Sequence, residues 1–270
     1  MTDPEFQEQI AAARAYETLH VPALFAEWAE PVLDAARVGS GGRVLDVACG
    51  TGLLARTASQ RVGPAGSVAG LDPSPGMLSV AEEIDADVDW RQGTAESLPF
   101  DEASFDAVVS QFGLMFFADR AQAIREMTRV LVPGGRLVVA VWDSLDNSPA
   151  YALEVDLLQR AAGQRAADAL RAPFVLGDRA ELAELFERSG VAPVEIATRT
   201  GTARFPSIRT MVEADLRGWL PVMGVELSED LIEKILTEAG SVLADFLITD
   251  GQVVFDSPAH IVTWRKPKQS

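Results

Sequence analysis

The spacing of apolar and polar residues divides the chain into a helical start and a longer part in which strands and helices alternate. Residues 5–37 place apolar side chains at helical intervals, with Pro22 and Pro31 as candidate breaks or helix starts. From Arg43 the pattern changes to short apolar runs, RVLDVA, GSVAGLD, VDWRQG, FDAVVSQ and GRLVVAVW, separated by segments of helical periodicity. Strands this apolar are buried on both faces, which is typical of parallel sheets. Residues 43–142 therefore predict a doubly wound α/β sheet.

The rest of the chain adds helices and two more strands. Asp178 is the predicted N-cap of a helix, with Glu181 three residues on and Gly190 at its end. The segments VAPVEIATRTG and QVVFDSPAHIVTWRKP predict strands, and two helical segments lie between them. We expect an α/β fold with a seven-stranded, mostly parallel sheet, N-terminal helices and a helical insertion between the last two strands. The expected domains are an N-terminal helical lid at 1–40, an α/β core at 41–201 and 252–268, and an insertion at 202–251 that forms a substrate lid.

Composition narrows the function classes. The 270 residues carry 40 acidic and 23 basic side chains, a net charge of −17, which argues against a nucleic-acid partner because phosphates are bound mainly by Lys and Arg. No apolar run approaches the ~20 residues that span a bilayer, and the first residues do not resemble a secretory signal, so we expect no membrane span and a cytoplasmic location. The single cysteine, Cys49, excludes an internal disulfide and argues against a structural zinc site; no metal is expected.

A glycine-rich turn follows the first predicted strand, in RVLDVACGTGLLARTAS. Its GTGLLA segment fits the dinucleotide pattern G-x-G-x-x-A, and Asp72 lies 20 residues past Gly52, where an acid for a ribose is expected. Asp46, near the end of the strand, argues against a bound pyrophosphate, because a carboxylate repels phosphate and attracts a sulfonium or ammonium group. The turn favours a cationic ligand, with a nicotinamide dinucleotide as the alternative.

Five motifs in order resemble those of class I S-adenosylmethionine-dependent methyltransferases, in the UbiE-like small-molecule branch. They are VLDVACGTG, GLDPSPGML, GTAESLPF, FDAVVSQFGLMFF and RVLVPGGRLVV, and they lie in the predicted sheet; the rest of the chain matches in layout only. The resemblance implies a Rossmann-like methyltransferase fold, S-adenosyl-L-methionine as cofactor and S-adenosyl-L-homocysteine as product.

The resemblance implies that the glycine-rich turn holds the methionine part of the cofactor. Backbone groups at Cys49, Gly50 and Gly52 would approach it, since glycine permits close approach and positive φ. Asp46 would favour its ammonium group, directly or through water. The family often has a further glycine where this chain has Ala48, a mild departure.

Residues after the second and third strands are implied in binding adenosine. Asp72 would accept hydrogen bonds from both ribose hydroxyls, or cap the next helix, or both. Pro73 and Met77 would pack near the adenosine. Thr94 stands where the family commonly has an acid for the adenine amino group; its hydroxyl can still accept a hydrogen bond, and the backbone of Ala95 would face the ring.

The segment after the fourth strand should lie where the transferred methyl group points. Gln111 is the candidate polar contact near the methionine part, and the candidate lining residues of the pocket are Phe112, Gly113 and Phe116.

The N-terminal helices supply further candidates. Tyr16 and Phe25 could cover the cofactor, with simple core packing as the alternative. Methyl transfer from a sulfonium is an in-line displacement, so catalysis rests mainly on alignment and on exclusion of water. His20 is the one candidate for a catalytic base, against the alternative of a surface or structural histidine.

These observations predict methyl transfer from S-adenosylmethionine to a small, apolar or aromatic metabolite. An insertion with Phe205, Met211, Trp219 and Met223 suits such an acceptor, although these side chains could equally form its own core. The alternatives are a cofactor-binding protein of the same fold with another role, such as a cyclase or a non-catalytic subunit, and an NAD(P)-dependent oxidoreductase. The acceptor atom and the oligomeric state stay open.

Overall fold

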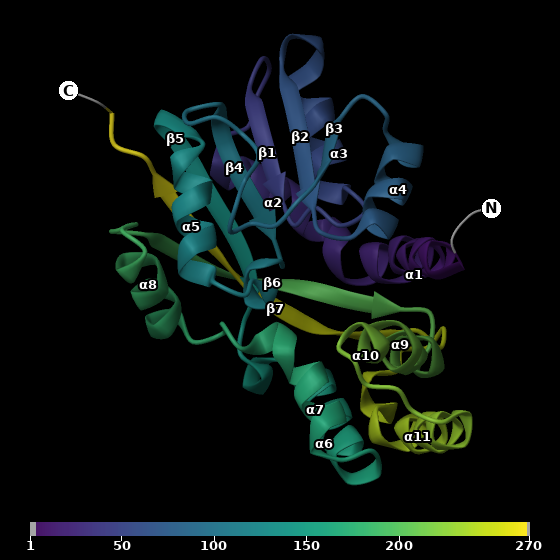
Figure 1. Cartoon of the computed structure of the whole chain (residues 1–270). Coiled ribbons are helices and arrows are strands. Elements are labelled where there is room, and N and C mark those ends of the chain that lie inside the picture. The colour runs from purple at the N-terminus through teal and green to yellow at the C-terminus, as the bar shows by residue number, and fades with distance from the viewer. Residues whose placement is uncertain (1–3, 269–270) are drawn as a thin grey trace.

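The computed structural model describes residues 4–268, and its centre is a seven-stranded sheet in the order β3-β2-β1-β4-β5-β7-β6 (Figure 1). The strands are β1 (Arg43–Val47), β2 (Ser67–Asp72), β3 (Asp89–Gln92), β4 (Phe105–Gln111), β5 (Leu131–Trp142), β6 (Glu195–Phe205) and β7 (Val253–Arg265). β7 runs antiparallel to β5 and β6, its two neighbours, and the other neighbouring strands are parallel to one another. The sheet confirms the predicted fold class, and its order reverses between β1 and β4, where folds of this type bind ligands.

The central strands are buried on both faces, as their unbroken apolar runs predict. Val108 and Val109 of β4 have no exposed surface and pair with Leu137 and Val138 of β5. Alternate side chains of a strand point to opposite faces, so helices must cover the sheet on both sides. This burial fixes the carboxyl ends of β1, β2 and β4, from which the site is built.

Three helices begin at polar N-cap side chains: α4 (Pro75–Ile84) at Ser74, α5 (Arg120–Arg129) at Asp119 and α8 (Arg179–Arg188) at Asp178. Helix α3 (Leu53–Val62) begins after Gly52, which supplies no side-chain cap. Asp178 accepts hydrogen bonds from the backbone N–H groups of Ala180 and Glu181, which confirms it as the N-cap of α8.

The N-terminal segment, called the lid below, consists of α1 (Pro4–His20), the π-helix η1 (Val21–Phe25) and α2 (Ala26–Ala36). The expectation that Pro31 marks a break or helix start is wrong, because Pro31 lies inside α2. The burial of Trp28 and Leu33 holds this helix in place, and packing overrides the local preference. In Figure 1, α1 lies beside α4, and a Cβ on Gly76 of α4 would come within 2.7 Å of the Gln9 backbone.

A second helical group, called the helical layer below, lies to one side of the sheet (Figure 1). Its members are α6 (Pro149–Ala161), α7 (Gln164–Arg171), α9 (Ile208–Ala214), the π-helix η6 (Asp215–Trp219), α10 (Leu220–Val222) and α11 (Glu229–Val242). The expected start of the insertion at residue 202 falls inside β6, which continues to Phe205 because it pairs with β7 along its whole length. Helices α6 and α7, which the sequence pattern did not indicate, come before β6; α6 packs against both α7 and α11 in the same layer.

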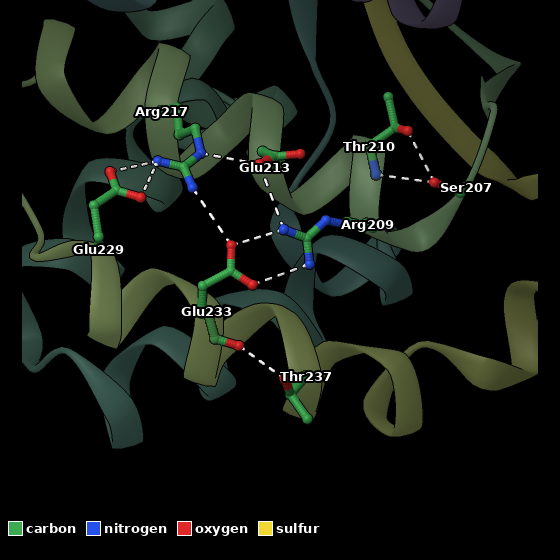
Figure 2. A network of polar contacts seen from close by, with 8 residues as sticks. All are labelled: Ser207, Arg209, Thr210, Glu213, Arg217, Glu229, Glu233 and Thr237. Carbon is green, nitrogen blue, oxygen red and sulfur yellow. Dashed lines mark hydrogen bonds and ion pairs between the residues drawn. The ribbon is translucent and has the colours of Figure 1, made fainter.

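A network of ion pairs joins η6 to α11 on the surface (Figure 2). The Arg217 guanidinium lies 3.0 Å from Glu213 and 2.5 Å from Glu229, and Arg209 lies 2.7 Å from Glu233. Exposed pairs contribute little singly, but a network of bidentate arginines fixes the relative position of two helices. Among residues 4–268, no helix has the length and apolar character needed to cross a membrane.

Candidate cofactor site

The glycine-rich turn links β1 to α3 through left-handed backbone conformations. Ala48, Gly50 and Gly52 have φ values of 59°, 56° and 85°. Gly52 must be glycine for a second reason, since a Cβ there would collide with the Trp90 ring. Ala48 adopts the left-handed conformation at the position where the family often has glycine, which costs about 1–2 kcal/mol for a residue with a side chain. The turn is therefore held in its shape by the surrounding structure.

Asp46 lies beneath this turn and is almost completely buried. Its Oδ2 atom accepts a hydrogen bond of 3.0 Å from the backbone N–H of Ala55, in the first turn of α3. The pKa of Asp46 is raised to about 8, mainly by burial and in part by the nearby charge of Asp72, against the opposing effect of the Ala55 hydrogen bond. Asp46 thus anchors the start of α3 and offers a carboxyl group that a neighbouring cation would ionise.

Asp72, the last residue of β2, ties the glycine-rich turn to the next loop. Its Oδ2 accepts from the Gly50 N–H and its Oδ1 from the Ser74 N–H, both at 2.9 Å. The N-cap of α4 is Ser74, whose hydroxyl accepts from Met77 N–H, so the cap role considered for Asp72 is wrong. Burial raises the pKa of Asp72 above its usual value. Each carboxylate oxygen has a second lone pair for a ligand hydroxyl.

The lid closes over the turn. The Tyr16 ring lies against Gly50, since a Cβ built there would be 3.8 Å from its Cε1 atom. Burial raises the pKa of Tyr16, and the nearby acids Asp72, Glu17 and Asp46 raise it further. Glu17 accepts hydrogen bonds from the Thr51 hydroxyl at 2.5 Å and from Arg56 at 2.7 Å. The turn is thus surrounded by acidic groups and covered on one side by α1.

Aromatic rings join the lid to the end of the sheet. Phe25 lies 5.6 Å from Phe112 and 5.9 Å from Trp142 between ring centroids. Phe112 has a φ of 58° and stacks on Trp142 at 3.7 Å. Gln111 donates a hydrogen bond of 3.1 Å to the Phe25 carbonyl, while its own Oε1 atom is buried without a partner. The lid is therefore packed on the carboxyl ends of β4 and β5.

The structure brings most of the sequence-predicted residues to this edge of the sheet. Cys49 is buried in the turn. Gly113 packs closely against Ala48, since a Cβ built on Gly113 would lie 2.6 Å from the Cβ of Ala48. Phe116 is 44% exposed and contacts Trp219 of the helical layer. Four further candidates lie close after the strand ends: Pro73 in the loop after β2, Met77 in the first turn of α4, and Thr94 and Ala95 in the loop after β3. Their roles toward the adenosine remain predictions.

Sequence reasoning missed Glu17, Thr51 and Trp142. Glu17 and Thr51 meet across 34 residues of sequence, and nothing in either local pattern indicates the contact. Two open hollows in the described part of the chain lie elsewhere. One of about 500 Å³ lies between the start of α5 and α8, and one of about 310 Å³ lies beside η6.

Comparison with known proteins shows the family to which this chain belongs. Residues 45–139 match the family model of the methyltransferase domain. The demethylmenaquinone methyltransferase of Staphylococcus carnosus is 36% identical over 188 residues, which cover 64% of this chain and 78% of that protein. The chain belongs to the UbiE-like class I S-adenosylmethionine-dependent methyltransferases.

Other comparisons with this methyltransferase agree. The ubiquinone/menaquinone biosynthesis C-methyltransferase UbiE of Hahella chejuensis is 43% identical over 126 residues, 44% of this chain and about half, 51%, of that protein. The YcgJ protein of Bacillus subtilis has the same fold, with a TM-score of 0.59 at 22% identity over 90% of this chain and 99% of that one. The cofactor is S-adenosylmethionine, and the nicotinamide alternative is wrong.

The affinity of this methyltransferase for S-adenosylmethionine is expected to rise with pH between 6 and 8. In the free protein the Asp46 carboxyl has a pKa near 8, and a sulfonium or ammonium group beside it lowers that pKa, so binding releases a proton below pH 8. One released proton increases the affinity about tenfold per pH unit, and the slope levels off above the free pKa. Calorimetry in buffers of different ionisation enthalpy counts the proton directly.

Asp46→Asn keeps an acceptor for the Ala55 N–H and should abolish the dependence of the affinity on pH. The matched control, Asp156→Asn, removes an exposed acid from α6 and should leave that dependence unchanged. An affinity that does not vary with pH in the unmodified protein would show that Asp46 does not face the cofactor's charge.

Proposed function

We propose that this enzyme transfers the methyl group to a small aromatic or apolar metabolite. The observation that carries the proposal is the band of aromatic side chains at the end of β4. Phe116 and Trp219 face each other at 5.1 Å, one from the segment after β4 and one from the helical layer. Rings placed in this way bind a flat apolar molecule by stacking and by removing its surface from water. Relatives that are named demethylmenaquinone methyltransferases support an acceptor of the quinol class.

Catalysis in this proposal rests on alignment and on exclusion of water. S-adenosylmethionine supplies an electrophilic methyl group. In this proposal the lid covers the glycine-rich turn and the helical insertion covers the acceptor, so that with the α/β core they form the three working parts of the protein. Fixing two reactants in an in-line arrangement can lower the barrier by about 7–11 kcal/mol. The closed contacts of Tyr16 and Glu17 with the turn are the features that would keep water out.

Replacing Trp219 by alanine should raise the KM for the acceptor about tenfold, which corresponds to the ~1.4 kcal/mol of a lost aromatic contact. The Trp219 indole N–H donates to the Ala169 carbonyl at 2.8 Å, so the ring is held in place by the protein itself. The assay uses methyl-labelled S-adenosylmethionine with a panel of quinols, phenols, polyketides and small amines. The affinity for the cofactor, measured by calorimetry, should not change.

Val222→Ala is the matched control, because Val222 lies three residues on and is 69% exposed. Equal losses of acceptor and cofactor binding in Trp219→Ala would place the ring at the cofactor instead. Labelled product from amines alone would contradict the aromatic acceptor.

A further inference from the structure

Buried ionisable side chains gather where the lid meets the helical layer. His20 ends α1, Asp215 begins η6, and Glu154 lies in the middle of α6. The Nε2 atom of His20 lies 3.9 Å from Oδ1 of Asp215. Asp215 is 5% exposed and Glu154 is not exposed at all. Tyr151, also in α6, is close enough that both acids raise its pKa. Three elements that are distant in sequence thus bring one imidazole and two carboxyl groups together.

Several polar atoms of this cluster are buried without a hydrogen-bond partner in the described protein. They are Nδ1 of His20, Oδ2 of Asp215 and both carboxyl oxygens of Glu154. A buried polar group left unpaired costs about 1–3 kcal/mol, and proteins rarely retain several of them in one place. Orphaned atoms on side chains from α1, α6 and η6 indicate that a polar ligand meets them.

The cluster adjoins the cofactor site on its acceptor side. The His20 ring stacks on Tyr16 with centroids 5.6 Å apart, and Tyr16 lies on Gly50 of the glycine-rich turn. From the other side, η6 carries both Asp215 and Trp219, the residue that faces Phe116. His20 immediately precedes the π-helix η1, and Asp215 begins the π-helix η6. Such π-helical turns are rare and frequently lie at functional sites.

We propose that His20 is the base that removes a proton from a hydroxyl group of the methyl acceptor, with Asp215 as its positioning residue and Glu154 binding a second oxygen of the same acceptor. The inference rests on the proposed function and narrows the acceptor to hydroxylated aromatic rings, of the phenol or quinol type. Because the Asp215 carboxylate faces Nε2, it favours the tautomer with the proton on that nitrogen and leaves the lone pair on Nδ1.

The proton and electron balance of this step is complete. The acceptor's O–H proton moves to Nδ1 of His20, and the electron pair released into the oxygen or the conjugated ring forms the new bond to the methyl carbon. When the ring carbon is methylated, that carbon then loses its own hydrogen as a proton to solvent, which restores the aromatic ring. The carbon–sulfur bond breaks and its pair stays on sulfur, which becomes a neutral thioether. The imidazolium that forms lies beside the Asp215 carboxylate, which stabilises it. Proton removal by a positioned base typically contributes 10²- to 10⁴-fold.

Glu154 suits the second role because burial and the charge of Asp215 raise its pKa well above its usual range. A neutral carboxyl group can donate a hydrogen bond to an acceptor oxygen, which an ionised one cannot.

A metal does not explain the cluster, since no three His, Cys, Asp or Glu side chains among residues 4–268 are placed to hold an ion.

The test compares acceptors of different acidity. At a pH where a nitrophenol is already ionised and an unsubstituted phenol is not, His20→Gln should lower kcat/KM for the phenol about 10²- to 10⁴-fold and for the nitrophenol by less than about tenfold. Asp215→Asn should show the same selectivity with a smaller loss. Asp156→Asn, on the exposed side of α6, is the control. Equal losses with both acceptors would overturn the base and leave His20 as a structural link between lid and helical layer.

A second measurement needs no turnover. The protein loaded with S-adenosylhomocysteine is titrated with the nitrophenol at a pH where the free compound is protonated, and the phenolate absorbance is recorded. The unmodified protein should bind it as the phenolate and His20→Gln as the neutral phenol. Equal ionisation in both proteins, or binding by neither, would overturn the inference. An unmodified enzyme that ionises the nitrophenol but methylates no hydroxylated ring would overturn the proposed function alone.

Discussion

Replacing Asp72 by alanine is expected to weaken S-adenosylmethionine binding about 10- to 150-fold, which corresponds to about 1.5–3 kcal/mol for hydrogen bonds to a charged group. Asp72 has one task that the structure shows and one that is expected of it. It ends β2 at the edge where the ribose is expected, and it accepts the N–H groups of Gly50 and Ser74. Alanine removes the ribose acceptor and also leaves both N–H groups without their partner, so the glycine-rich turn loses part of its support.

Calorimetry gives the affinity, and thermal unfolding separates the two tasks. Asp72→Asn retains one acceptor oxygen, so its affinity for S-adenosylmethionine should lie between that of the alanine variant and that of the unmodified protein. Asp87→Ala, an exposed acid before β3, should change neither affinity nor stability. A folded Asp72→Ala protein with unchanged affinity would show that Asp72 only supports the loop.

The elements that sequence reasoning predicts well are those with local signals. Each short apolar run became a strand of the sheet, and Asp178 caps its helix because the N-cap contact spans three residues. β6 lies further along the chain than its local pattern predicts, because it pairs with β7 as far as Phe205. β5 begins earlier than predicted, at Leu131, which pairs with Phe105 of β4. Pro31 shows the reverse case, in which packing of α2 overrides a local helix breaker.

The residues of the candidate site also divide into those with a local sequence signal and those without one. Asp46, Gly52 and Asp72 stand in motifs next to strand ends, where a parallel sheet collects its ligand contacts, and the structure places them together. Glu154 and Asp215 carry no such signal. Each is an acid inside a helical segment, a pattern typical of a solvated surface. Only the tertiary structure shows that both are buried, Asp215 beside His20 and Glu154 close to Asp215.

Replacing Glu154 by methionine is expected to stabilise the protein while it impairs the enzyme. The buried carboxyl group has no hydrogen-bond partner in the described protein, and its removal relieves about 1–3 kcal/mol of unfavourable burial. Methionine is similar in size, unbranched and compatible with a helix, so α6 should keep its packing. The unfolding temperature, measured by calorimetry, should rise by about 5 °C at neutral pH. The KM for a hydroxylated acceptor should rise, since one of its hydrogen-bond partners is lost.

The stabilisation by Glu154→Met should grow with pH. The folded-state pKa of Glu154 lies well above its ordinary value of 4.5. Below pH 4.5 the carboxyl group is protonated in both states and its titration contributes nothing. Above that pH the carboxyl group ionises in the unfolded chain before it ionises in the folded protein. The unmodified protein therefore loses stability as the pH rises, until the folded carboxyl group also ionises. The methionine variant has no such group and does not lose this stability. Asp156→Met, at an exposed position of the same helix, should show no such trend. A loss of stability in Glu154→Met at neutral pH would mean that this carboxyl group is stabilised within the folded protein rather than kept for a ligand.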